Sequence, residues 1–193
     1  MKVKINKSNP YGEVVAPPSK SLSHRALICG ALCNGAVENL GFSNDIIATV
    51  NCLKSLGAYC KIGENNARIG GLDPFNIREG LILDCGESAS TLRFLFPLCL
   101  LSGKKITLKG TKRLFERPLE VYEKLCAEQG ISFEKNETSI TVSGCLSNGN
   151  YKIPGNVSSQ FVSGLLFALP MLSGVSIIEI DGELESAPYV GLT

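Results

Sequence analysis

Three short stretches of the sequence combine hydroxyl, amide and cationic side chains at places where a helix is expected to begin. They read "SKSLSHRAL" from Ser19, "ESASTLRFL" from Glu87 and "SSQFVSGLL" from Ser158. A helix N-terminus offers unpaired N–H groups and a positive dipole, and small hydroxyls let an oxyanion come close to the backbone. Lysine and arginine add charge-assisted hydrogen bonds. The chemistry indicated is the binding of a small anion by the following residues: Ser19, Lys20, Ser21, Arg25, Ser88, Ser90, Arg93, Ser158, Ser159 and Gln160.

Each of these features also has a purely structural interpretation. A serine at a helix start is commonly just a cap. An isolated arginine such as Arg93 is commonly solvated or ion-paired, and Arg117 in the loop "RLFERPLE" could pair with Glu116 or Glu120. By pattern alone, Tyr189 could equally belong to the core. Repetition of the arrangement in three places favours the anion-binding interpretation.

The three stretches recur because the chain itself repeats. Each runs from a polar opening through an apolar helix to a glycine, at Gly35, Gly103 and Gly174, with the same spacing in all three. The first two glycines are followed by a β-rich run, a second helix and a hairpin, "YCKI" with "ARIG" and "SFEK" with "SITVSG". The third unit begins at "YKIP" and stops at "SAPYVGLT", where Pro188 marks the first turn of a second helix. We predict an α/β (α+β) fold of repeated β-α-β-α-β-β units with a truncated third unit.

Composition excludes several classes of function. The net charge is +1 and no basic tract is present, which argues against a nucleic-acid partner. The densest apolar stretches, "FLFPLCLL" and "LLFALPML", are interrupted by Pro97 and Pro170 and are too short to cross a membrane. The amino terminus lacks the apolar core of a secretory signal. We therefore expect a cytoplasmic protein whose partners are small molecules.

The cysteines and the single histidine do not indicate a metal site. None of the 8 cysteines forms a Cys-x-x-Cys pair. Five lie in helical apolar patterns and are expected to be reduced core residues: Cys29, Cys33, Cys52, Cys99 and Cys126. His24 lacks the clustered partners that zinc requires, and we expect it on a helix surface. No metal and no cofactor are predicted.

The motifs resemble those of the 5-enolpyruvylshikimate-3-phosphate synthases, the 3-phosphoshikimate 1-carboxyvinyltransferases of the enolpyruvyl transferase family. The resemblance runs through "PPSKSLSHRAL", "SNDIIATVNCLKSLGA", "DCGESASTLRFL", "FERPLE", "NVSSQFVSGLL" and "SAPYVGLT". It implies an enzyme of the shikimate pathway of aromatic amino-acid biosynthesis. Such an enzyme moves the enolpyruvyl group of phosphoenolpyruvate to the 5-hydroxyl of shikimate 3-phosphate and releases phosphate.

The resemblance also implies a domain organisation. The family enzyme has two domains, each an inside-out barrel of three β-α-β-α-β-β units. On this basis, residues 1–13 hold an opening strand, around Val3 to Ile5, and a crossover that belong with a second domain missing here. Residues 14–193 form the first domain, incomplete at its C-terminal end.

Substrate roles carry over to individual positions of this sequence. Lys20 resembles the lysine that touches both substrates, and Ser21, Arg25 and Tyr189 resemble contacts of the shikimate moiety. Gln160 resembles the glutamine that lies against the shikimate ring and phosphoenolpyruvate, and Arg117 and the "ESAS" turn match the phosphoenolpyruvate site. The phosphate-binding serines correspond to Ser158, Ser159 and Ser186.

Two positions depart from the family pattern. Ala89 stands where glycine is usual, in the turn that borders the site where glyphosate competes with phosphoenolpyruvate, and its methyl group should lower glyphosate affinity more than phosphoenolpyruvate affinity. Ala187 stands where Arg, Lys or Thr is commoner, and nothing in the sequence explains it.

The catalytic groups are expected outside this chain. In the family, the aspartate, glutamate and lysine proposed for the proton transfers lie in the second domain, so this chain carries half of the site, no catalytic residue and, alone, no expected turnover. Two alternatives stay open. One is a non-catalytic anion-binding module of the same fold. The other is an enolpyruvyl transferase acting on UDP-N-acetylglucosamine, which fits less well because its first motif lacks this Ser-Lys-Ser and Arg pattern.

Overall fold

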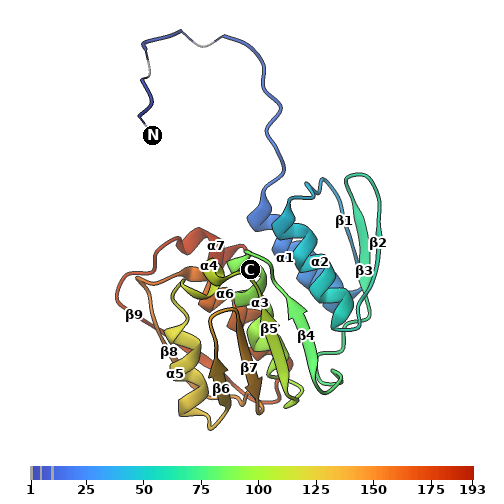
Figure 1. Ribbon diagram of the computed structural model, residues 1–193, viewed down its shortest axis with the longest axis vertical. Coiled ribbons are helices and arrows are strands. Elements are labelled where there is room, and N and C mark those ends of the chain that lie inside the picture. Colours follow the sequence, from blue (N-terminus) through green and yellow to red (C-terminus); the bar gives the residue numbers. More distant parts are fainter. Residues whose placement is uncertain (1, 5, 10) are drawn as a thin grey trace.

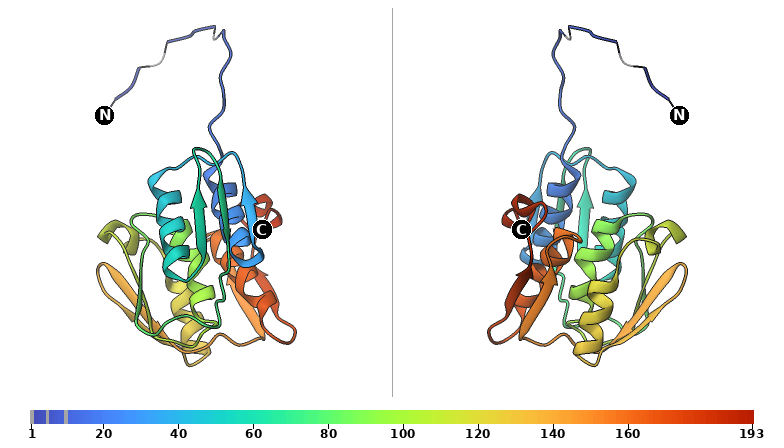
Figure 2. Two further views of the ribbon diagram at one scale, coloured as in Figure 1. Left: turned by 90° about the vertical axis from the view of Figure 1, so that its right-hand side faces the viewer. Right: turned by 90° about the vertical axis from the view of Figure 1, so that its left-hand side faces the viewer.

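The structure, a computed structural model, describes residues 2–4, 6–9 and 11–193. The described parts of the segment before the first helix extend away from the body and contain no helix or strand (Figures 1 and 2). The strand expected around Val3 to Ile5 falls partly on Ile5, which is outside the described residues. Among the helices of the described ranges, none is both long and apolar enough to cross a bilayer.

The first unit contains all of the predicted elements except an opening strand. Its elements are α1 (Lys20–Cys33), β1 (Gly35–Val37), α2 (Asn44–Ser55), β2 (Tyr59–Ile62) and β3 (Ala67–Gly70). The strands form an antiparallel sheet in the order β1-β3-β2, and the hairpin closes with Ile62 opposite Ala67. Residues 11–19 form no strand, so one edge of β1 has no strand beside it within the described chain.

The second unit shows the predicted β-α-β-α-β-β order in full. Its elements are β4 (Leu81–Asp84), α3 (Ala89–Cys99), β5 (Ile106–Lys109), α4 (Lys112–Phe115), α5 (Glu120–Glu128), β6 (Ser132–Lys135) and β7 (Ser139–Ser143). The sheet order is β4-β5-β7-β6, with β4 and β5 parallel because α3 crosses between them. The short helix α4 was not expected from the sequence.

The third unit shows the predicted β-α-β order followed by a short second helix. Its elements are β8 (Asn150–Pro154), α6 (Ser159–Ala168), the 3-10 turn η1 (Leu169–Met171), β9 (Ile177–Asp181) and α7 (Ala187–Gly191). Strands β8 and β9 are parallel, like β4 and β5, and Pro188 lies in the first turn of α7. In both views of Figure 2, the β6–β7 hairpin and the β8–β9 pair flank α3 and α5.

Helix α3 lies at the centre of the core and packs along α6. Proline has no N–H, so Pro97 in the last turn of α3 leaves the carbonyl oxygen of Arg93 without its usual helical partner. The hydroxyl of Tyr122 on α5 donates to that oxygen at 2.6 Å, and its ring stacks on Phe96 with centroids 4.4 Å apart. Gly164 of α6 lies against the same two groups, because a Cβ there would overlap both the Arg93 carbonyl and the Tyr122 hydroxyl.

The prediction that His24 lies on a helix surface is wrong, because its side chain is only 2% exposed. It is accommodated in the core because Nδ1 is hydrogen-bonded to the Thr49 hydroxyl at 2.7 Å and Phe94 packs edge-on against its ring. Burial lowers the pKa of His24 from 6.5 to about 4. The histidine is therefore neutral at pH 7.

The cysteine prediction is confirmed at three positions and wrong at two. Cys52, Cys99 and Cys126 are buried thiols. Cys29 and Cys33 are exposed, since they lie on the outer face of α1, where no described element covers them. All 8 cysteines, which all fall within the described ranges, are free.

Candidate functional site

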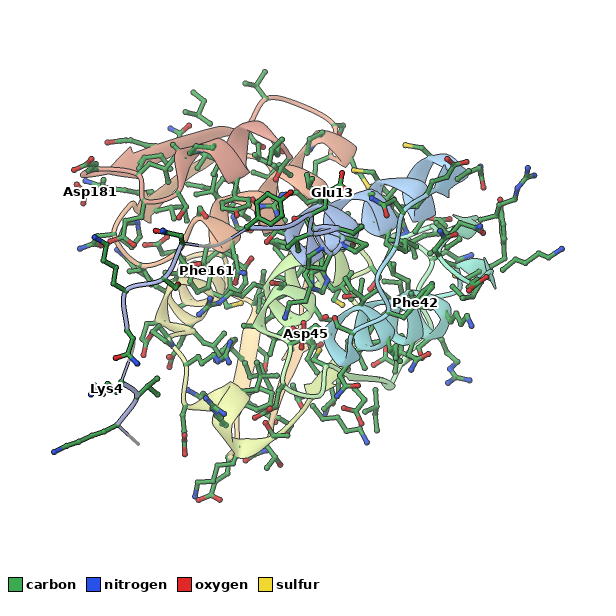
Figure 3. The ribbon with its side chains drawn as sticks, turned by 90° about the horizontal axis from the view of Figure 1, so that it is seen from above. Lys4, Glu13, Phe42, Asp45, Phe161 and Asp181 are labelled. Carbon is green, nitrogen blue, oxygen red and sulfur yellow. The ribbon has the colours of Figure 1, made fainter. Side chains whose placement is uncertain are left out.

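A cavity of about 600 Å³ lies where the N-terminal ends of α1, α3 and α6 come together beside α7. Figure 3 views the molecule from above and labels Asp45, in the first turn of α2, and Phe161, in the first turn of α6. All ten residues assigned to a site from the sequence line this cavity: Lys20, Ser21, Arg25, Ala89, Arg117, Ser158, Ser159, Gln160, Ser186 and Tyr189. Further lining residues are Asp45, Glu87, Ser88, Ser90, Arg93 and Arg113. Cationic side chains outnumber carboxylates, so the cavity suits an anion.

Serines cap all three helices, and two of these caps, Ser88 and Ser158, also line the cavity. The Ser19 hydroxyl accepts a hydrogen bond from the Leu22 amide at 3.4 Å. Ser88 accepts from Thr91 at 3.1 Å, and Ser158 accepts from the Gln160 amide at 3.3 Å. The capping interpretation is therefore right for all three serines, and it places helix N-termini around one cavity.

Lys20 forms an ion pair with Asp45, with Nζ 2.7 Å from Oδ2. Both side chains keep solvent exposure, at 57% and 33%, so the pair is weak and the ammonium can turn toward a ligand. Sequence reasoning missed Asp45. The available signal was its place at the start of α2, next to the Ser43 cap, since α2 begins at the same side of the unit as the neighbouring helices.

Arg25 joins three helices at the edge of the cavity and is only 5% exposed. Its Nη2 donates to the Ser163 hydroxyl of α6 at 2.9 Å, and its Nε donates to the Thr193 hydroxyl, just beyond α7, at 2.7 Å. The guanidinium also lies 5.6 Å from the Tyr189 ring. Burial lowers the pKa of Arg25, but a guanidinium remains charged at neutral pH.

Arg93 is buried and connects the second unit to the third. Its Nη1 donates to Gln160 Oε1 at 3.0 Å and its Nη2 donates to the Pro118 carbonyl at 2.9 Å. Its Nε is buried and has no hydrogen-bond partner among the described residues. The alternative interpretation of Arg93 as a solvated or ion-paired arginine is therefore wrong. The side-chain Nε2 of Gln160 also donates to the Ser90 hydroxyl at 2.9 Å. Arg93 and Ser90 therefore together orient the Gln160 side chain.

The remaining predicted residues lie on the open side of the cavity. Arg117 follows the short helix α4, is exposed, and forms no ion pair with Glu116 or Glu120 within the described part of the chain. Tyr189 is 42% exposed, which excludes a core role. Ser186 has a left-handed backbone, φ 57°, and its side chain does not cap α7.

A second cavity, of about 370 Å³, lies between α5 and β8. Its floor is formed by apolar side chains such as Val121, Leu125 and Ile153, and its charged residues are of both signs. It contains none of the capping serines, and its apolar lining does not fit the anion chemistry that the sequence indicates.

Fold and cavity together define the class of this protein as a repeated α/β domain with a cationic, hydroxyl-lined cavity at its helix N-termini. The chain belongs to the EPSP synthase (3-phosphoshikimate 1-carboxyvinyltransferase) family, whose sequence model matches residues 6–193. The family resemblance in the motifs is thus confirmed.

Individual relatives agree with this assignment. The 3-phosphoshikimate 1-carboxyvinyltransferase of Clostridium kluyveri is 47% identical over 195 residues, which cover 99% of this chain and 46% of the relative. That of Clostridium perfringens strain SM101 is 44% identical over 196 residues, covering 100% and 46%. An EPSP synthase structure from Acinetobacter baumannii superposes with a TM-score of 0.76 at 20% identity, covering 93% of this chain and 42% of that one. The chain therefore spans about half the length of the relatives that it matches.

Proposed function

We propose that this chain provides the first-domain half of a site that transfers the enolpyruvyl group of phosphoenolpyruvate to the 5-hydroxyl of shikimate 3-phosphate, with release of phosphate. The single observation that carries the proposal is the convergence of three serine-capped helix N-termini, with arginines and a lysine, on one cavity of about 600 Å³. Both substrates are small anions, which such a cavity holds through N–H groups, hydroxyls and cations.

In this proposal, different residues of the cavity bind the two substrates. Arg25, Ser21 and Tyr189 hold the shikimate moiety, and the serines at the start of α6, with Ser186, hold its phosphate. Lys20 and Gln160 lie between the two substrates. Arg117 and the start of α3 hold phosphoenolpyruvate. The support is geometric, because all of these groups line the same cavity.

The proposed chemistry divides the work between this chain and sequence outside it. The substrate hydroxyl oxygen bonds to C2 of phosphoenolpyruvate, the carbon that carries the phosphate, while a base takes the hydroxyl proton and a proton is added to the methylene carbon. Phosphate then leaves C2 and a proton leaves the methyl group, so that the double bond reforms. A base and a proton donor are needed, and the family resemblance places them in the second domain. We propose that residues 14–193 belong to the first of two inside-out barrels and that residues 1–13 cross to the second.

Shikimate 3-phosphate is expected to bind the wild-type chain, and the Arg25→Ala variant is expected to bind it more weakly. The loss should be ~1.5 to 3 kcal/mol, because a charge-assisted hydrogen bond to the substrate disappears. Isothermal titration calorimetry measures both affinities. Arg68→Ala, which removes an exposed arginine from β3 away from the cavity, should bind like the wild type. Equal affinities of the Arg25→Ala and wild-type proteins would contradict the assigned substrate site.

Glyphosate is expected to inhibit the full-length protein more strongly after Ala89→Gly. The Ala89 side chain is buried at the start of α3 and lines the cavity, so its removal widens the turn on the phosphoenolpyruvate side. Inhibition constants against phosphoenolpyruvate, measured for both forms, test this, with the Michaelis constant for phosphoenolpyruvate as the internal control. Unchanged sensitivity to glyphosate would refute the role given to the methyl group.

A further inference from the structure

A buried chain of hydrogen bonds leads from His24 to the cavity. His24 Nδ1 lies 2.7 Å from the Thr49 hydroxyl, which lies 2.7 Å from the Thr91 hydroxyl, which lies 2.7 Å from the Ser88 hydroxyl. All four side chains are almost completely buried, at 3% exposure or less. Only Ser88 reaches the cavity. The chain therefore connects the core to the surface where the ligand is expected.

The heavy-atom geometry favours one direction for the hydrogens in this chain. Thr91 is the favoured donor to Ser88, and a hydroxyl has a single hydrogen to donate. The Thr49 hydroxyl must then donate to Thr91, and His24 must donate to Thr49 from a protonated Nδ1. The competing acceptor, the Asp45 carbonyl oxygen, is 3.3 Å from the Thr49 hydroxyl and 3.4 Å from the Thr91 hydroxyl, too far to displace the shorter bonds.

The direction of the chain leaves one donor unused at the cavity. The Ser88 oxygen accepts from both the amide and the hydroxyl of Thr91. Its own hydrogen donates to no group in the described part of the chain. Ser88 lines the same cavity as Arg93, whose Nε is also buried and unpartnered. A buried hydroxyl with a free hydrogen, in the same cavity as a guanidinium, is a donor suited to an anionic oxygen.

We propose that Ser88 is a ligand-binding residue whose hydroxyl donates to a carboxylate or phosphate oxygen, and that His24 is the positioning residue that sets this direction. With its proton on Nε2 instead, His24 would accept from Thr49, every hydroxyl could reverse, and the Ser88 hydrogen would turn inward to Thr91. The inference rests on the proposed function. The low pKa of His24, about 4, supports it because the ring stays neutral at pH 7.

The tautomer of His24 tests the direction without any ligand. His24 is the only histidine of the chain, so 15N-histidine labelling gives one ring to follow by long-range 1H–15N NMR. We expect a protonated Nδ1 and an unprotonated Nε2 at pH 7. Thr49→Val, which removes the acceptor, should shift the ring toward Nε2–H. The control Thr141→Val breaks the Thr107–Thr141 hydrogen bond of the sheet and should leave these signals unchanged. A wild-type ring protonated on Nε2 would overturn the inference.

Binding measurements test the role of Ser88. Inorganic phosphate, phosphoenolpyruvate and shikimate 3-phosphate are titrated separately, which distinguishes a carboxylate-bearing from a phosphate-only ligand. Ser88→Ala should weaken binding of at least one probe by roughly ten- to a hundredfold. Ser43→Ala removes the equivalent cap of α2, outside the cavity, and should change none. If the wild type binds the probes and Ser88→Ala binds each of them with the same affinity, only this inference fails. If the wild type binds none, the proposed function and the anion-binding half of this inference fail together.

Discussion

Replacing Gly164 with alanine is expected to destabilise the domain by about 3 kcal/mol. The added Cβ would overlap the Arg93 carbonyl and the Tyr122 hydroxyl, which are hydrogen-bonded to each other. Overpacking in a core costs ~1 to 3 kcal/mol, and displacing Tyr122 leaves a buried carbonyl unpaired at a further ~1 to 3 kcal/mol. The gain in helix propensity from glycine to alanine, ~1 kcal/mol, offsets only part of this.

Urea unfolding of the wild type and Gly164→Ala measures this difference in free energy. Gly191→Ala is the matched control, because Gly191 also lies in a helix but a Cβ there meets no atom within 4 Å. The free energy of unfolding of this control should equal that of the wild type or be slightly larger. In a Tyr122→Phe background Gly164→Ala should cost less, since one of the two overlapping groups has gone. A Gly164→Ala protein as stable as the wild type would show that α3 and α6 are not packed this closely.

The second large effect is a loss of stability in acid that depends on His24. Its pKa is lowered from 6.5 to about 4 in the folded protein, chiefly by burial and further by Lys20 and Arg25, while Asp45 raises it. Between these two pH values the unfolded chain binds the proton and the folded chain does not. The stabilisation is therefore complete above pH 6.5 and is lost as the pH falls toward 4. The loss should be about 3 kcal/mol.

The pH dependence of the unfolding free energy, measured from pH 7.5 to pH 4, checks this expectation for wild type and His24→Asn. Acidic side chains make similar contributions to the pH dependence of stability in both proteins. The difference between the two curves therefore gives the contribution of His24. The variant should be less stable at pH 7 but should lose less on acidification. A histidine that titrates near 6.5 in the NMR spectrum of the folded protein would contradict the prediction, because the ring would then be accessible to water.

Much of the local structure could be predicted because it depends on short-range chemistry. The two hairpins follow from alternating residues around tight turns, and the serine caps and the glycines after the helices mark where helices begin and end. Pro188 marked the first turn of α7 because proline is favoured there. The short helix α4 was missed because a single turn has too few residues for a periodic pattern.

The candidate site was also predictable only in part. Its residues could be collected from repeated motifs, and the structure brings all ten to one cavity. Their contacts could not be predicted. Arg93 was predicted to be part of an anion site, but it is buried, and its partners, Gln160 and the Pro118 carbonyl, come from distant parts of the chain. Asp45 was missed because its role depends on Lys20, which lies in another helix.

The sequence by itself determined the repeat, the helix ends and the types of side chain that they present, because caps, turns and periodicity are properties of neighbouring residues. Only the tertiary structure decided which of these side chains are buried and which partner satisfies each one. His24 illustrates the difference. Its neighbours in sequence indicate an exposed helix face, but packing of α1 against α2 and α3 brings Thr49 and Phe94 to it. A buried polar group requires a partner, and that partner is chosen by packing between distant segments.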